Sequence, residues 1–267
     1  MTSNSSKNVW PNRLNQMQPL QVDDVMIRID RYCDSRGLEY PKKDGATDRP
    51  AEQVLLSDDT PTFIPENYEP KYAYPLIVWL SQPGQPNQES LDLMPRISTR
   101  NYFALSLSGL PTSPTQSDGT LQDEQLIRIE QELFDKVCLL RRTFHVHSER
   151  IYLAGIDDQA TQAIQLVLNR PEWFDGALLL GARFPNTRNP LARFRELSGK
   201  RILIGAGLRD SRIAIADVVK TGRLLHAAGL EVSTRIYDAG PEITPNMLTD
   251  IDHWLMQGLY EGRELRV

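Results

Sequence analysis

Residues 150–182 read RIYLAGIDDQATQAIQLVLNRPEWFDGALLLGA, and they decide the fold class. Two short apolar runs, Arg150–Ala154 and Gly176–Leu180, have the length and composition of buried strands. Between them, Gln159–Asn169 carries apolar side chains at helical spacing, which predicts a helix. A strand, a tight turn, a helix and a second strand, in this order, form the repeating unit of a mostly parallel sheet.

The same alternation continues on both sides of this stretch. From residue 74 onward, short apolar runs predict strands and longer amphipathic runs predict helices. The further strands are expected at Leu76–Leu80, Tyr102–Leu107, Arg201–Gly205 and Glu231–Tyr237, and the further helices at Asp123–Arg142, Ile213–Ala228 and Pro245–Leu259. An antiparallel edge is expected earlier in the chain, at Gln53–Leu56 and Thr62–Ile64. The prediction is an α/β fold with a mostly parallel central sheet flanked by helices on both faces.

Length and charge limit the domain count and the kinds of partner. The 267 residues, 40% of them hydrophobic, suit one sizeable core. Residues 1–50 are polar and irregular, so we expect an N-terminal extension with a possible short helix at 22–33, followed by one domain over 51–267. The formal net charge is -5, and charges of both signs are interleaved, which disfavours nucleic acid as a partner.

Targeting signals and metal-binding patterns are not apparent in the sequence. It has no apolar run of the length of a signal peptide or of a membrane span, so a cytoplasmic protein without membrane contact is expected. Cys33 and Cys138 are far apart and have no ligand-like spacing, which indicates neither a disulfide framework nor a zinc site. We therefore expect no cofactor.

Three segments resemble, in the correct order, the carboxylesterase and phospholipase branch of the α/β-hydrolase superfamily. Residues 64–88 (IPENYEPKYAYPLIVWLSQPGQPNQ) resemble the first core strand and the oxyanion loop of that family. Residues 150–182 resemble its nucleophile elbow with the following helix and strand, and residues 201–255 resemble its acid loop, last strand, histidine loop and C-terminal helix. The resemblance spans about residues 62–259 and implies the fold of a carboxylic-ester hydrolase.

The catalytic positions implied by this resemblance are not occupied as in an active enzyme. Active members carry a serine in the turn G-x-S-x-G, followed along the chain by an acid and a histidine. Here Asp157 occupies the serine position and Gln159 replaces the second glycine. Asp210 matches the acid, whereas Pro241 stands where the histidine is expected. Proline has no titratable group, so it cannot transfer the proton that acyl transfer requires.

The oxyanion loop departs from the family pattern as well. Where the family has a His-Gly pair followed by glycines, this chain has Ser81-Gln82-Pro83-Gly84-Gln85, and Pro83 removes one backbone N–H group. By resemblance, Ser81, Gln82 and Asp158 are the candidates for the substrate-binding oxyanion region. The combined changes predict a catalytically inactive or impaired pseudo-esterase whose former cleft binds a small ligand or a protein.

An active alternative makes Asp157 the nucleophile towards an ester or a related small substrate. Such an enzyme needs a histidine to activate the water that hydrolyses the covalent intermediate. His145 and His147 precede the strand that leads into the elbow, which puts them at the wrong end of the sheet. His226 and His253 lie on predicted helices and are interpreted as surface or partly packed residues.

Two other uses of the acidic residues are open. Asp157, Asp158, Asp210 and Glu242 could converge on Mg²⁺ or Ca²⁺, since hard cations prefer oxygen ligands. The favoured interpretation is that the Asp157 side chain caps the following helix, where an aspartate satisfies free N–H groups.

The remaining features are interpreted as structural. The segment Arg183–Arg195 contains four arginines, and we favour a solvated loop over an anion-binding or partner-binding surface. Leu110–Thr120 is expected to be a surface loop near the pocket. Four large aromatic residues are expected in the core: Trp79, Phe103, Phe174 and Trp254.

Overall fold

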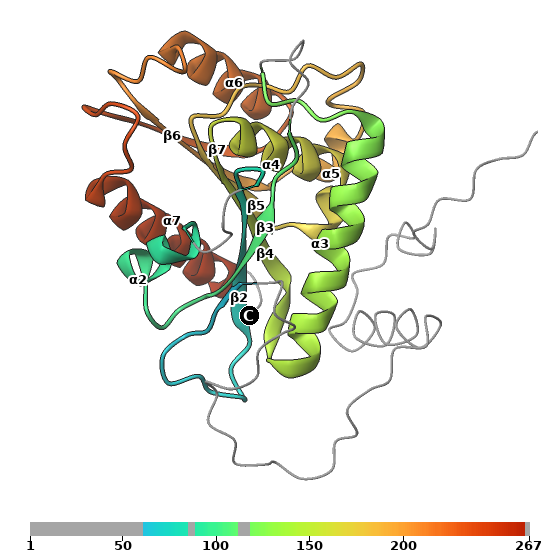
Figure 1. Ribbon diagram of the computed structural model, residues 1–267, viewed down its shortest axis with the longest axis vertical. Coiled ribbons are helices and arrows are strands. Elements are labelled where there is room, and N and C mark those ends of the chain that lie inside the picture. The colour runs from blue at the N-terminus through green and yellow to red at the C-terminus, as the bar shows by residue number, and fades with distance from the viewer. Residues whose placement is uncertain (1–60, 85–88, 112–117, 265–267) are drawn as a thin grey trace, which may run out of the picture. The chain divides into compact units, whose positions relative to one another are not determined.

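The computed structural model describes residues 61–84, 89–111 and 118–264, and these form a seven-stranded sheet with helices on both faces (Figure 1). The strand order is β1-β3-β2-β4-β5-β6-β7. The strands are β1 (Thr62–Phe63), β2 (Tyr74–Ser81), β3 (Phe103–Ser108), β4 (Val146–Ile156), β5 (Gly176–Leu180), β6 (Arg201–Gly207) and β7 (Glu231–Tyr237). Only β1 pairs antiparallel among these strands, and the other neighbours are parallel.

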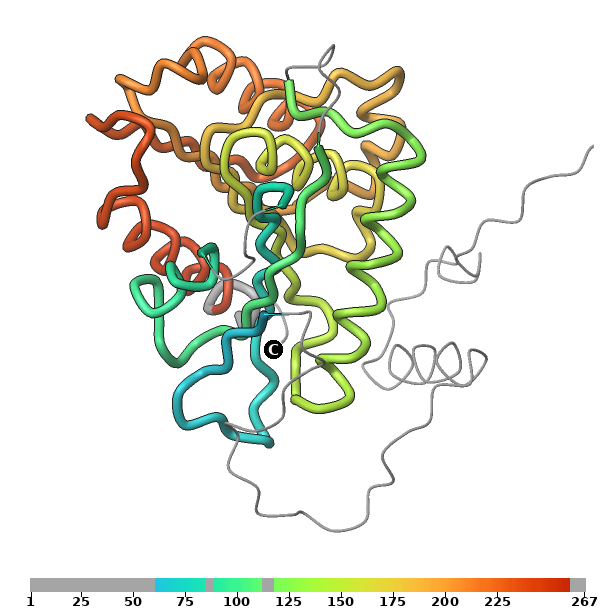
Figure 2. The backbone as a smooth tube through the Cα atoms, viewed as in Figure 1, coloured from blue at the N-terminus to red at the C-terminus, as the bar shows by residue number. Residues whose placement is uncertain are grey.

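The helices divide between the two faces because alternate strand residues point to opposite sides. They are α2 (Met94–Ile97), α3 (Asp123–Thr143), α4 (Asp158–Asn169), α5 (Phe194–Leu197), α6 (Ile215–Ala227) and α7 (Pro245–Glu264). One core cluster joins the sheet to α3, α4, α5 and α6, and a second joins its other face to α2 and α7. Figure 2 shows α2 and α7, which are far apart in the sequence, side by side.

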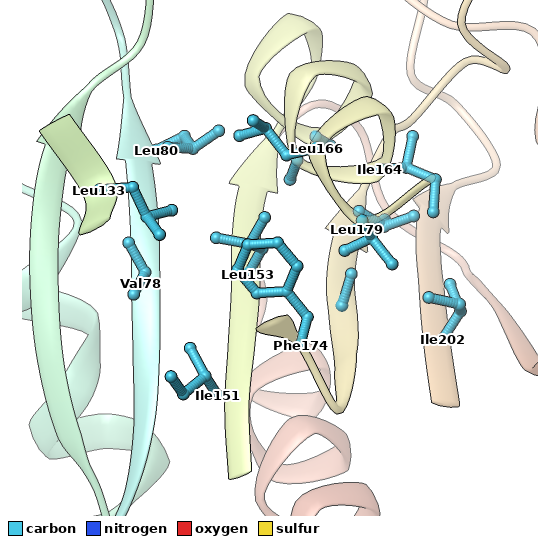
Figure 3. Close-up of a cluster of buried hydrophobic side chains, with 14 of the residues drawn as sticks. Val78, Leu80, Leu133, Ile151, Leu153, Ile164, Leu166, Phe174, Leu179 and Ile202 are labelled. Atoms are coloured by element: carbon cyan, nitrogen blue, oxygen red, sulfur yellow. The ribbon is translucent and has the colours of Figure 1, made fainter. Parts of the chain in front are cut away.

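Apolar strand residues form the centre of the larger cluster, between the sheet and the helices that cover it. Figure 3 shows Val78, Leu153, Leu179 and Ile202, from four neighbouring strands, together with Ile164 of α4. The four aromatic residues expected in the core are all buried, which confirms that prediction: Trp79, Phe103, Phe174 and Trp254.

The predicted architecture is confirmed, including the antiparallel edge at β1. Strand β4 begins earlier than expected, at Val146 rather than Arg150, because Val146 already pairs with Tyr74 before a register shift. The expected strand Gln53–Leu56, the possible helix 22–33 and the boundary at residue 50 lie outside the described residues, as does Cys33. Cys138 is buried and is not in a disulfide. Among the described residues, no helix is long and apolar enough to cross a membrane.

Candidate functional site

The sharp turn between β4 and α4 has the backbone geometry of a nucleophile elbow. Asp157, the single residue between the two elements, has φ 55° and ψ −118°. A non-glycine residue in such a region carries about 1–3 kcal/mol of strain. Two features maintain the turn. The Asp157 N–H donates to the Leu180 carbonyl at 2.8 Å, and a Cβ at Gly155 would lie only 2.5 Å from the Gln159 backbone. The strained backbone conformation of the elbow is therefore present here with an aspartate in the position where the family has a serine.

Gln159, which replaces the second glycine of the elbow, is accommodated by a glycine elsewhere. Its side chain is buried, and a Cβ at Gly109, just after β3, would lie 3.0 Å from Gln159 Cγ. Two further glutamines of α4 hold the loop that follows Gly109. Gln162 accepts from the Leu110 N–H at 3.1 Å and donates to its carbonyl at 2.7 Å, and Gln165 makes the same pair of bonds to Leu121. The ends of the loop expected on the surface are therefore buried, because α4 satisfies their peptide groups.

One arginine side chain joins the three triad-equivalent positions. Arg212 Nη1 lies 2.5 Å from Oδ2 of Asp157. Its Nε and Nη2 donate to Oδ1 and Oδ2 of Asp210 at 3.1 and 2.9 Å, and Nη2 also donates to the Pro241 carbonyl at 2.8 Å. The structure thus brings Asp157, Asp210 and Pro241 together, around a guanidinium group.

The two carboxylates of this cluster differ in solvent exposure and in the direction of their pKa shifts. The Asp210 side chain is 6% exposed, and hydrogen bonds from Arg212 hold its pKa below the usual range. The Asp157 side chain is 21% exposed, and burial raises its pKa, although the charge of Arg212 acts in the opposite direction. The pKa of Arg212 is raised by its bonds to Asp210 and by the charge of Asp157, so this side chain stays protonated.

The prediction that the Asp157 side chain caps the following helix is wrong. Asp157 does occupy the cap position of α4, but its side chain makes no capping hydrogen bond, because its carboxylate is directed to Arg212. The other acids are also engaged: Asp158 lies 3.5 Å from Arg183 Nη1, and Glu242 accepts from the Gly240 N–H at 3.1 Å. Within the described part of the chain, no group of three or more acidic, histidine or cysteine side chains is arranged to hold a metal ion.

The segment Arg183–Arg195 is tied to the domain at both ends. Arg183 Nη2 donates to the Arg212 carbonyl, which links the segment to the site. At the other end, Arg193 pairs with Glu172 at 2.7 Å and with Glu196. These partners restrain the two arginines more than the expected solvated loop would.

The oxyanion candidates differ in what they offer to the site. The Ser81 hydroxyl is buried, lies 2.9 Å from Ser106 Oγ and donates to the Leu107 carbonyl at 3.0 Å. The Ser81 hydroxyl therefore forms its hydrogen bonds within the sheet. Gln82 is exposed, and Asp158 is partly exposed at the first turn of α4. Their predicted role in an oxyanion region stays a prediction.

Solved structures with a similar fold include carboxylesterases. A carboxylesterase from Bacillus cereus is 20% identical, with 74% of this chain and 93% of that chain covered and a TM-score of 0.59. A carboxylesterase from Mesorhizobium loti is 19% identical (69% and 90% covered, TM-score 0.56), and SOBER1 from Arabidopsis thaliana is 15% identical (70% and 100% covered, TM-score 0.55). The chain has the α/β-hydrolase fold. No family model and no curated protein matches the sequence.

In an α/β-hydrolase fold the substrate cleft is expected where the strands end at their carboxyl edge. Here that edge holds a crevice of about 20 Å³, lined by residues that include Asp157, Asp210, Arg212 and Pro241. Such a volume accommodates roughly one water molecule. A larger hollow, about 490 Å³, lies away from these residues, and its described lining belongs entirely to α6. Among the described residues, the crevice at the hydrolase triad positions is therefore small.

The histidines of this hydrolase-fold chain do not complete a triad. His145 lies just before β4, where its Nδ1 is 3.0 Å from the Pro70 carbonyl, and His147 Nδ1 accepts from the N–H groups of Glu149 and Arg150. His226 and His253 are exposed on α6 and α7. No hydrogen bond between described residues joins a histidine to Asp157.

Arg212 is the site residue that sequence reasoning missed. The family pattern has a histidine as the proton carrier, and an arginine, which is a cation of a different type, does not match that pattern. The available signal was its position two residues after Asp210, on the acid loop itself. That spacing lets the Arg212 backbone N–H and its side chain bind the same carboxylate.

Proposed function

We propose that this α/β-hydrolase-fold protein is a pseudo-esterase, catalytically silent, in which Arg212 takes the place of the histidine. The observation that carries the proposal is the Arg212 guanidinium lying between the carboxylates of Asp157 and Asp210. Acyl transfer needs a group that accepts a proton from the nucleophile and returns it to the leaving group. A guanidinium has no acceptor site and does not deprotonate in proteins, so it cannot perform this step.

The small size of the crevice supports the same proposal and favours a protein over a small ligand as the partner. A crevice of about 20 Å³ offers little enclosed space to an ester, and most Arg212 donors are already used by Asp157, Asp210 and Pro241. Small-molecule sites have volumes of roughly 300–1,000 Å³. A protein partner would instead contact the charged rim around the crevice, where the Arg212 side chain is 44% exposed.

Active-site labelling and turnover test the proposal directly. We expect no labelling by a fluorophosphonate probe and no hydrolysis of short-chain nitrophenyl esters above that of heat-denatured protein. Asp157→Ala is the matched variant, because it removes the residue in the nucleophile position. Saturable turnover that this variant loses would overturn the proposal.

A second candidate function uses Asp157 as a nucleophile towards carbon. The preserved elbow conformation favours it, since that geometry presents the residue at a strand end. The Asp157 carboxylate lies beside Arg212, and no hydrogen bond between described residues joins it to a histidine that could activate water afterwards. This candidate predicts that an alkyl halide or an epoxide leaves a stable ester on Asp157, which mass spectrometry of the intact protein would detect. Asp157→Asn, which retains the shape, is the control, and an unmodified wild-type protein would exclude the candidate.

A further inference from the structure

The last strand of the sheet, β7, is exposed to an extent that its neighbours are not. All five residues of β5 and all residues of β6 except Arg201 are buried, whereas no residue of β7 is buried. Ile236 in β7 is 42% exposed. On its outer side, β7 pairs with no other described strand. An edge strand of this kind presents unpaired peptide groups to any second strand that approaches it.

The peptide groups on the outer side can be identified from the hydrogen bonds on the inner side. The Glu231 N–H donates to the Lys200 carbonyl at 2.9 Å, and the Tyr237 carbonyl accepts from the Leu208 N–H at 2.7 Å. Residues 231 and 237 therefore face β6. Because the direction of peptide groups alternates along a strand, the N–H and C=O groups of Val232, Thr234 and Ile236 point outward.

We propose that β7 is the interface of a two-fold symmetric dimer, in which the β7 strands of two copies pair antiparallel around Thr234. In this register Thr234 lies opposite Thr234 of the second copy, and Val232 lies opposite Ile236. All outward N–H and C=O groups of these three residues then find partners across the axis. Pairing around Ser233 would instead require the Leu230 N–H, which already donates to the Leu225 carbonyl at 3.2 Å.

The side chains of β7 fit a second copy of the same strand. Val232 and Thr234 face α6, where they are the neighbours of Gly222, so the apolar pair of Val232 and Ile236 forms on that face. Cross-strand pairs of β-branched residues stabilise antiparallel sheets. On the opposite face, Glu231 of one copy lies diagonally across from Arg235 of the other, within reach of long side chains. Both residues are exposed.

The charges on β7 also indicate that the strand that pairs with this edge is β7 of a second copy. Charged residues on a lone edge strand discourage pairing, but these two are opposite in sign and attract each other across the axis of a two-fold arrangement. An isologous contact satisfies both pairs at once, because each copy offers the same surface. A single strand pair buries less than a standard interface, so we expect dissociation in the micromolar range.

Sedimentation velocity at about 1–200 µM tests the dimer on the full chain. We expect concentration-dependent dimerisation of the wild type. Arg235→Glu places like charges across the seam and should weaken association at least tenfold, roughly 1.4 kcal/mol. Exchanging the two charges, with Glu231→Arg and Arg235→Glu together, should restore it. The matched control is Arg223→Glu on the outer face of α6, which makes the same charge change and should leave association unaltered.

Thr234→Pro gives an independent test, because it removes an outward N–H and leaves the bonds to β6 in place. It should abolish dimerisation while circular dichroism still reports a folded chain. A wild type that stays monomeric up to 200 µM would overturn the proposal. So would a charge exchange that fails to rescue the Arg235→Glu variant when both proteins are folded, since the register would then be wrong.

Discussion

Replacing Arg212 with alanine removes the cation between Asp157 and Asp210, and we expect a loss of about 2 kcal/mol of unfolding free energy. The variant leaves two partly buried carboxylates without their common partner. Asp210 keeps the hydrogen bond from the backbone N–H of residue 212 but loses the two bonds from the side chain. Asp157 loses the ion pair of 2.5 Å.

The magnitude follows from how exposed the three side chains are. An exposed ion pair contributes about 0–1 kcal/mol, and breaking a buried pair costs about 3–5 kcal/mol. The Asp210 side chain is 6% exposed, that of Asp157 is 21% exposed and therefore only partly buried, and that of Arg212 is 44% exposed and partly screened by solvent. An intermediate value of about 2 kcal/mol results.

Arg209→Ala is the matched control, because it removes an arginine from the same loop. Arg209 pairs with Asp238 at 3.3 Å, and these side chains are 67% and 79% exposed. We expect this variant to lose less than about 0.5 kcal/mol. Urea unfolding followed by circular dichroism measures both. Equal effects of the two substitutions would refute the view that the Arg212 network is partly buried and stabilising.

Acid should reduce the difference between the wild type and the Arg212→Ala variant. The pKa of Asp210 is lowered in the folded protein, so its stabilising contribution is present above about pH 4 and is lost as the pH falls through the folded value. The pKa of Asp157 is raised, so its contribution is present below the unfolded pKa and is lost as the pH rises through the folded value. Without Arg212 the pKa values of both carboxyl groups are higher than in the wild type, and the variant becomes relatively more stable in acid. A difference that does not change between pH 7 and pH 3 would contradict this assignment.

Three further substitutions test the elbow and its supports. Asp157→Gly should be about 1–2 kcal/mol more stable than Asp157→Ala, because only glycine relieves the positive φ and both variants lose the same ion pair; equal denaturation midpoints would contradict the strain. Gly155→Ala should cost about 3 kcal/mol, since its Cβ would lie 2.5 Å from the Gln159 backbone; an unchanged melting temperature would show that the turn can relax. Gln162→Leu should cost about 2 kcal/mol and speed hydrogen exchange at the Leu110 amide, which loses its partner; unaltered exchange there would contradict the clamp.

The sequence by itself determined the order of strands and helices and the residues at the triad-equivalent positions. Local patterns were sufficient for the order of the elements, because most buried strands are short apolar runs and each long covering helix has one apolar face. The triad-equivalent positions came from the resemblance to the hydrolase family. The resemblance to the hydrolase family placed the sharp turn at Asp157, between the expected strand end at Ala154 and the expected helix start at Gln159, and the structure narrows the gap to this one residue. It also placed Asp210 and Pro241 at loop positions that the structure brings to one crevice.

Only the tertiary structure decided what those positions do. The ion-pair partner of Asp157 is Arg212, which lies in the loop after β6 and is far from Asp157 in the sequence. A rule based on neighbouring residues predicts instead that the carboxylate binds the free N–H groups of α4. The position of β7 at the edge was likewise decided by the tertiary structure. Its sequence, with Glu231 and Arg235, is more polar than that of β5, but being an edge depends on the neighbour that a strand lacks. The periodicity of apolar residues indicates which side of a helix or strand faces the core. An ion pair or a free sheet edge depends instead on which other elements pack next to that helix or strand.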